Sequence, residues 1–143
     1  MTTATGRFEV SMEPIGDAGD PGDTDDAPGD GGEVAGVDHH RLRKHYEGGL
    51  VGTGQGHVLS LATATEGSAG YVAIELVEGE LGSRRGGFAL QHFGLMDRGE
   101  VEWRIPVIPD SGTGGLHGIS GALVIEVDDA GNHTYSLTYE LPA

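Results

Sequence analysis

Apolar and polar residues alternate along much of this chain with a period of two. Near the N-terminus, for example, Phe8, Val10 and Met12 alternate with polar residues. This pattern is typical of a half-buried β-strand. No segment has apolar residues at helical spacing between capping residues, so we predict an all-β protein. The alternation, bounded by turn residues, predicts eight strands at residues 2–14, 37–47, 50–63, 69–79, 84–95, 99–108, 116–127 and 132–141.

The connections between most of these strands are short and rich in turn-forming residues. Examples are Glu47-Gly48-Gly49, Glu66-Gly67-Ser68 and Asp97-Arg98-Gly99, which favour antiparallel hairpins. An open eight-stranded sheet would leave two unpaired edges, whereas a barrel removes them. Glycines inside predicted strands, such as Gly54 and Gly94, allow the sharp coiling that a small barrel needs. The expected fold is an eight-stranded antiparallel β-barrel, with a β-sandwich as the alternative.

One connection differs from the rest, because residues 15–33 consist almost entirely of Gly, Pro, Asp and other small residues. Seven of the chain's 23 acidic residues lie between positions 17 and 33, where there is no Lys or Arg. So little apolar area cannot offset the entropy of an ordered chain. We therefore expect residues 15–33 to be an acidic flexible loop within a single domain that spans residues 1–143.

Charge and composition exclude several classes of function. The formal net charge of -15 would repel nucleic acid and anionic lipid, and the absence of Cys excludes disulfides and thiol nucleophiles. No apolar run approaches the roughly 18 residues of a transmembrane helix, and the N-terminus lacks the features of a signal peptide. We expect a cytoplasmic protein that binds neither nucleic acid nor membrane.

Three segments resemble a bacterial family known as domain of unknown function 3224. They are Tyr71–Gly79 (YVAIELVEG), Gly86–Gly94 (GGFALQHFG) and Ser111–Gly114 (SGTG). The last segment, with the glycines that follow it, is also similar to a strand entry of allene oxide cyclase-like and dirigent-like barrels. The resemblance covers the whole chain and implies an allene oxide cyclase-like barrel, usually oligomeric. Related barrels isomerise or cyclise small molecules. The acidic segment at residues 15–33 departs from the family pattern.

Two ionisable residues are candidates for catalysis. Hydrophobicity alone would turn Glu75 to solvent, but the family pattern implies that it faces the barrel interior, where burial would raise its pKa and suit it to acid or base catalysis. His92 shares a strand face with Phe88 and Leu90 and is expected to point inward. Pairing of the two strands would place position 92 opposite about 74–75, making Glu75 and His92 neighbours. Such a pair serves acid–base catalysis or a purely structural hydrogen bond.

Aromatic and apolar side chains on the predicted inward faces suggest the wall of a pocket. A filled barrel interior is the alternative, because eight strands leave little space inside. The candidate substrate-binding residues are Tyr46, Tyr71, Phe88, Leu90, Trp103, Tyr135 and Tyr139.

No metal site is expected. His39 and His40 are adjacent on a strand and face opposite ways, and the other histidines are scattered. The acidic segment counted from Asp23 has Pro28 and Val34 where a calcium-binding EF-hand loop requires Gly and Glu.

Three classes of function remain open. The first is a cofactor-independent isomerase or cyclase that encloses a hydrophobic small-molecule substrate and uses Glu75 with His92. The second is a non-catalytic binding protein for a hydrophobic small molecule. The third is a filled barrel that acts only through its outer surface. If Glu75 points inward, then Val72, Ile74 and Leu76 must face outward as an apolar stripe, which a homodimer would cover.

Overall fold

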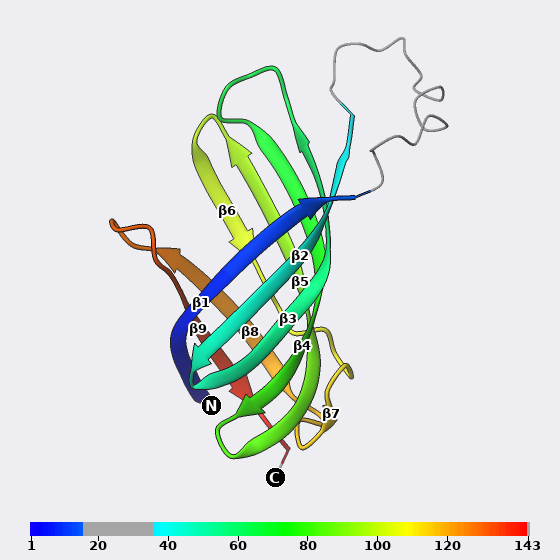
Figure 1. Cartoon of the computed structure of the whole chain (residues 1–143), viewed down its shortest axis with the longest axis vertical. Helices are drawn as coiled ribbons and strands as arrows, with labels where there is room; N and C mark the ends of the chain where they lie inside the picture. The colour runs from blue at the N-terminus through cyan, green and yellow to red at the C-terminus, as the bar shows by residue number, and fades with distance from the viewer. Residues whose placement is uncertain (16–35, 143) are drawn as a thin grey trace.

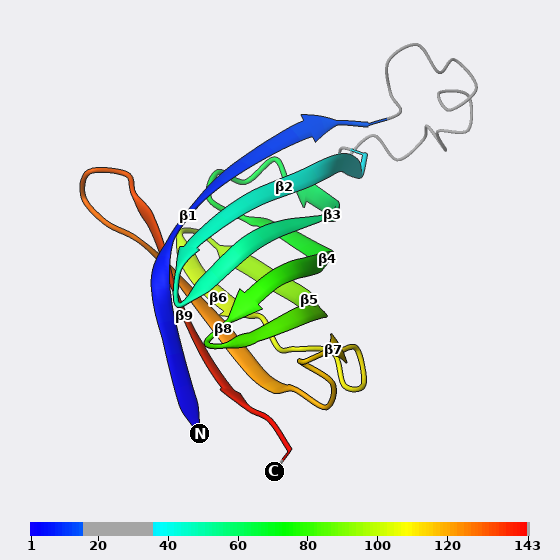
Figure 2. The ribbon, with the colours of Figure 1, turned by 60° about the horizontal axis from the view of Figure 1, so that its bottom comes forward.

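The computed structural model describes residues 1–15 and 36–142, and these residues form one antiparallel β-barrel (Figures 1 and 2). Apart from Ile15, the segment expected to be a flexible loop lies outside the described residues. The strands are β1 (Thr2–Pro14), β2 (Asp38–Gly48), β3 (Leu50–Ala62), β4 (Ala69–Leu81), β5 (Arg84–Asp97), β6 (Glu100–Arg104), β7 (Thr113–Gly114), β8 (Ser120–Val127) and β9 (His133–Glu140).

Neighbours in sequence pair as hairpins along most of the barrel wall. The order of strands is β6-β5-β4-β3-β2-β1-β9-β8, so β1 joins the C-terminal strand β9. The ends of the sheet meet just beyond β6, where Leu123 N–H donates to the carbonyl of Ile105 and Val107 N–H donates to the carbonyl of Gly121, at 2.8 and 2.9 Å. This seam closes the barrel at one end only, because β6 itself pairs with β5 alone.

The structure corrects two of the expected strand boundaries. The strand expected at 99–108 is regular only to Arg104, because Pro106 lacks the N–H that a ladder needs. The strand expected at 116–127 begins at Ser120, since Leu116 to Gly118 form a turn in which Gly118 has a φ of +82°. The segment Ser111–Gly114 includes the short strand β7, which pairs with β5.

Side chains from β1, β2, β4, β5, β8 and β9 fill the interior of the barrel near the closed end. On β4, Val77 and Leu81 are buried, whereas Val72, Ile74 and Leu76 are 49%, 45% and 54% exposed on the outer surface. The expected apolar stripe is therefore present. Among the residues described, no helix is long and apolar enough to cross a membrane.

Candidate functional site

An apolar pocket of about 490 Å³ occupies the end of the barrel that the seam leaves open. Its walls come from eight strands and include Val10, Leu42, Val58, Ala73 and Ile125. Lys44 and His92 also line it, although both are buried. The pocket is thus a mostly apolar chamber whose wall includes two buried residues with ionisable nitrogen groups.

Behind these two groups lies Glu75, which is completely buried. Its Oε1 is 2.8 Å from His92 Nε2 and 3.1 Å from Lys44 Nζ. Its Oε2 accepts a hydrogen bond of 2.5 Å from the hydroxyl of Tyr46. We refer to Lys44, Tyr46, Glu75 and His92 as the charged cluster. It combines one carboxylate with three potential donors from β2 and β5.

Glycines on β3 let the charged cluster assemble across that strand. Lys44 and Tyr46 come from β2 and Glu75 from β4, so the two groups are separated by the whole of β3. Gly54 occupies an inward position on β3, and a Cβ there would lie 2.1 Å from Glu75 Oε2. Any side chain at position 54 would therefore displace the carboxylate.

The surroundings of Glu75 favour its ionised form. Burial raises the pKa of this carboxyl. The hydrogen bond with His92, the positive charge of Lys44 and the hydrogen bond from Tyr46 lower the pKa, and together they outweigh the effect of burial. The net pKa is below the ordinary value of 4.5. This corrects the expectation that burial would prevail and equip Glu75 as a general acid. Glu75 is instead an anion that holds its neighbours.

The same burial acts on the other members of the cluster. Burial raises the pKa of the Tyr46 hydroxyl, and the negative charge of Glu75 raises it further, so Tyr46 stays protonated and donates to Glu75. Burial lowers the pKa of Lys44 by more than the attraction of Glu75 raises it. The Lys44 amine is therefore easier to deprotonate than an ordinary lysine.

His92 and Glu75 meet in a slightly different register from the expected one. The hairpin turn is Gly82-Ser83, with Leu81 opposite Arg84, and this places His92 opposite Ala73 rather than opposite 74–75. Since Glu75 pairs with Leu90, it is a diagonal neighbour of His92. The longer side chains bridge that diagonal, so the expected contact forms.

Lys44 was not among the residues expected at the site. It follows Arg43 and precedes His45, both exposed, in a run of basic residues that resembles a solvated face. The period-two pattern of the strand would have identified it, because Lys44 lies on the same strand face as Leu42 and Tyr46, which are both buried.

The structure places some of the residues expected to line the pocket at its wall and others in the packed core. Tyr71 lines the pocket and packs on β5 at Gly94, where a Cβ would lie 2.2 Å from the Tyr71 ring. Phe88, Leu90, Tyr135 and Tyr139 are buried but belong to the packed core and do not line this pocket. Tyr135 is engaged by the backbone, since its hydroxyl accepts a hydrogen bond from the N–H of Leu50 at 2.8 Å.

Trp103 lies at the pocket wall but is not enclosed. It is 43% exposed, because at this level β6 pairs with β5 alone and the contacts with β8 start only at Ile105. Trp103 was expected to point inward, and it does line the pocket, but it is only partly enclosed.

No group of three or more His, Asp or Glu side chains in the described part of the chain is arranged to hold a metal ion. His39 and His57 do meet, with Nε2 and Nδ1 2.9 Å apart, but they are a pair on the surface.

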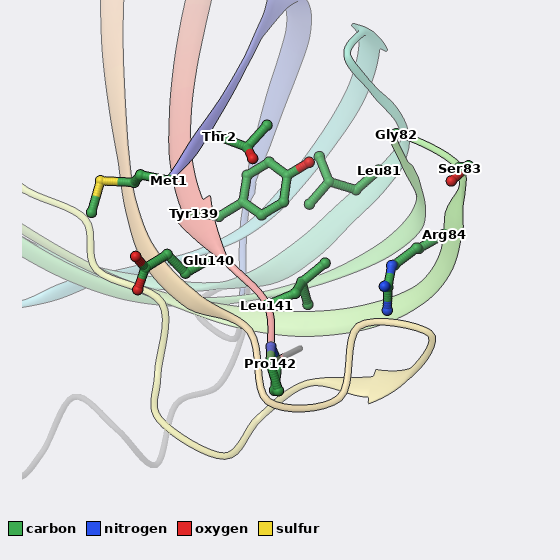
Figure 3. Close-up of a pocket in the computed structure, with 10 residues that line it drawn as sticks. All are labelled: Met1, Thr2, Leu81, Gly82, Ser83, Arg84, Tyr139, Glu140, Leu141 and Pro142. Atoms are coloured by element: carbon green, nitrogen blue, oxygen red, sulfur yellow. The ribbon is translucent and has the colours of Figure 1, made fainter.

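A second pocket, of about 600 Å³, lies at the opposite end of the barrel. Figure 3 shows Tyr139 between Thr2 and Leu81, with Arg84 on the β4–β5 hairpin and Glu140 at the end of β9. Its charged residues are exposed to solvent. We therefore regard the pocket above the charged cluster as the candidate site.

Fold and site together define a small antiparallel β-barrel with ionisable groups beneath an apolar pocket. The chain belongs to the family described as protein of unknown function (DUF3224), whose model matches residues 4–139. It is similar to a solved structure of a protein with unknown function from the same family, from Shewanella oneidensis MR-1, with 39% sequence identity and a TM-score of 0.85. That match covers 100% of this chain and 98% of the other. No curated protein matches the chain.

Proposed function

We propose that this protein is a cofactor-independent isomerase or cyclase that binds a hydrophobic small molecule in the pocket above the charged cluster. The observation that carries the proposal is the buried Glu75–His92 pair, at 2.8 Å, on the wall of an otherwise apolar chamber. Buried charged groups cost free energy even when paired, and titratable groups in a cleft are a common feature of active sites.

In this proposal His92 moves the proton. Its Nε2 is held by Glu75, and Nδ1 makes no hydrogen bond with the residues that the structure describes. A ring fixed at one nitrogen presents the other in a defined direction, as acid–base catalysis requires. Glu75 does not line the pocket; it orients the imidazole and stabilises the positive charge that His92 acquires. The apolar walls hold the substrate in one conformation, and a conformation that brings the reacting atoms together favours ring closure.

Hydron exchange tests this role. Small molecules released from the purified protein by denaturation, together with a panel of apolar ketones and enones, are incubated with the native protein in D2O. Deuterium incorporation is followed by mass spectrometry. We expect incorporation with the wild type and a loss of at least about a hundredfold in His92→Gln, the usual contribution of one acid–base group.

His133→Gln is the matched control, because His133 also lines the pocket but does not contact Glu75. It should exchange deuterium at the wild-type rate. Equal rates in His92→Gln and the wild type would remove His92 from the mechanism.

A non-catalytic binding protein is the second candidate, and the composition of the pocket favours it. Among the residues described, Lys44 and His92 are the only buried ionisable groups that line the pocket. Most of the pocket wall is apolar, as in binding sites for hydrophobic ligands. The fluorescence of Trp103, the single tryptophan, reports binding directly. Saturable quenching without any deuterium incorporation would favour this second function.

We also propose that a second copy of the chain covers the outer apolar stripe. The apolar surface formed by Val72, Ile74 and Leu76 extends onto the two neighbouring strands. Val72 pairs with Leu59 of β3 on one side and with Phe93 of β5 on the other. Leu59 is itself 47% exposed. A continuous apolar surface of this kind on an isolated protein is a common mark of an interface, and a twofold dimer is the commonest way to bury it.

A further inference from the structure

Lys44 is the only lysine in the chain, whose seven other Lys or Arg residues are all arginines. The arginines of β2 are exposed, whereas Lys44 is only 6% exposed and lines the pocket. Lys44 is therefore part of the pocket wall, and its Nζ, the single primary amine carried by a side chain, is itself buried. This position is unusual for lysine, which is almost never fully buried.

The amine of Lys44 has unused bonding capacity. Its Nζ lies 3.1 Å from Glu75 Oε1, yet it makes no well-aligned hydrogen bond with any residue described. Each oxygen of Glu75 also binds another group, since Oε1 binds His92 and Oε2 binds Tyr46. The rest of the ammonium's surroundings is aromatic, with the Phe8 ring centroid 4.7 Å away and that of Tyr46 5.6 Å away.

We propose that Lys44 forms an imine with the carbonyl group of an apolar aldehyde or ketone bound in the pocket. This inference rests on the proposed function only in that the pocket must admit a small molecule. It adds a substrate class, carbonyl compounds, and a covalent role for Lys44.

The step balances without a cofactor. The ammonium releases one proton, and the nitrogen lone pair attacks the carbonyl carbon, so a C–N bond forms and the carbonyl π pair moves to oxygen. The oxygen takes up protons from the nitrogen and from solvent and leaves as water while C=N forms. One ammonium and one carbonyl thus give one iminium and one water, with no net change in protons or oxidation state.

The charged cluster favours both the attack by the amine and the iminium that forms from it. Since burial lowers the pKa of Lys44, more of it is free amine at neutral pH than of an exposed lysine, as in other imine-forming lysines. Glu75 stays ionised beside Nζ and becomes the counter-ion of the iminium, so the charge of the cluster is the same before and after. His92, which shares Glu75 Oε1 with Lys44, is placed to carry the proton.

Reductive trapping tests the proposal on the full-length protein. The protein is incubated at pH 7 with cinnamaldehyde and sodium cyanoborohydride, which reduces an imine to a stable secondary amine. Intact mass and peptide mapping then locate the adduct. Only Lys44 and the α-amino group of Met1 offer primary amines, so the map has two sites to distinguish.

Arg43→Lys supplies the matched control, because it places a second lysine one position away on the exposed face of the same strand. A lowered lysine pKa gives more free amine at pH 7. Because burial lowers the pKa of Lys44 and the pocket holds the aldehyde at its wall, we expect trapping at Lys44 to be faster than at the introduced lysine. Lys44→Arg should abolish the adduct and retain the fold in circular dichroism.

A purely structural Lys44 would give a different result. Trapping at Lys44 no faster than at the lysine introduced by Arg43→Lys, or trapping at Met1 alone, would overturn the inference. Quenching of Trp103 by cinnamaldehyde without reductant separates the two proposals. If quenching occurs without trapping, the imine is wrong and the binding pocket stands, whereas absence of both removes the pocket as well.

Discussion

The first prediction concerns the buried pair of Lys44 and Glu75, examined by a double-mutant cycle. Glu75→Gln keeps the shape of the side chain but leaves the Lys44 ammonium without its anion. Removing one partner of a buried ion pair typically costs about 3–5 kcal/mol. Lys44→Met removes the cation and leaves Glu75 with His92 and Tyr46. Because the double variant buries neither charge, we expect it to be more stable than the sum of the single effects predicts, by about 2 kcal/mol or more.

The pH dependence of the Glu75→Gln effect follows from the two lowered pKa values. Below about 4.5 the unfolded chain takes up a proton on Glu75 while the folded protein does not, so the stabilisation that ionised Glu75 provides is lost progressively as the pH falls through the lowered pKa of the folded state. As the pH rises towards 10.5, Lys44 gives up its proton, in the variant before the wild type because the variant lacks the charge of Glu75 that raises the Lys44 pKa, and the missing anion matters less. The cost of the variant should therefore be largest between these limits and shrink on both sides.

Urea unfolding monitored by circular dichroism and by Trp103 fluorescence supplies the four free energies of unfolding at each pH. A coupling energy below about 0.5 kcal/mol would mean that the two residues act independently. A cost of Glu75→Gln that does not vary between pH 4 and pH 10 would likewise refute the assignment of opposite charges to the pair.

Three further predictions follow from other features. Gly54→Ala should destabilise the protein by about 2 kcal/mol or more, through collision of its Cβ with Glu75, whereas Gly36→Ala, with no atom within 4 Å, should be neutral in the same urea titration. Tyr135→Phe should cost about 1–3 kcal/mol in thermal unfolding, because the buried N–H of Leu50 loses its partner; a cost near zero would show that another acceptor replaces the hydroxyl. Light scattering should find a dimer that Ile74→Gln weakens and Val124→Gln, on exposed β8, leaves intact; a monomeric wild type would contradict the proposed interface.

Alternation and turn chemistry were sufficient to predict the all-β fold, because each hairpin is a local feature of the sequence. The contact of Glu75 with His92 was also expected, because both residues lie on one hairpin and the family resemblance, unlike hydrophobicity alone, placed Glu75 inside. Features that depend on distant parts of the chain were not predicted. The partial exposure of Trp103 results from where β6 and β8 meet, and no local pattern reveals the position of that seam.

The pKa of Glu75 illustrates the same limit. Its burial was expected, but the direction of its pKa depends on His92, Lys44 and Tyr46 together, and the last two are about thirty residues away in sequence. Those two side chains reach Glu75 only because Gly54 leaves the intervening strand bare. A lysine among arginines and histidines resembles a surface residue until the strand face that it shares with Leu42 and Tyr46 is considered.

The two faces of β4 have a consequence for how the chain folds. Residues 72–77 (VAIELV) carry apolar side chains on both sides of the strand, and hydrophobicity alone would place the face that carries Glu75 outside. Such short β-prone segments aggregate readily when they remain unpaired. The two-residue turn at Gly82-Ser83 pairs β4 with β5 through purely local contacts, and early closure of this hairpin would hold Glu75 on the correct side and shield the segment. Substitutions in that turn should therefore reduce the yield of soluble protein more than they reduce the stability of the folded barrel.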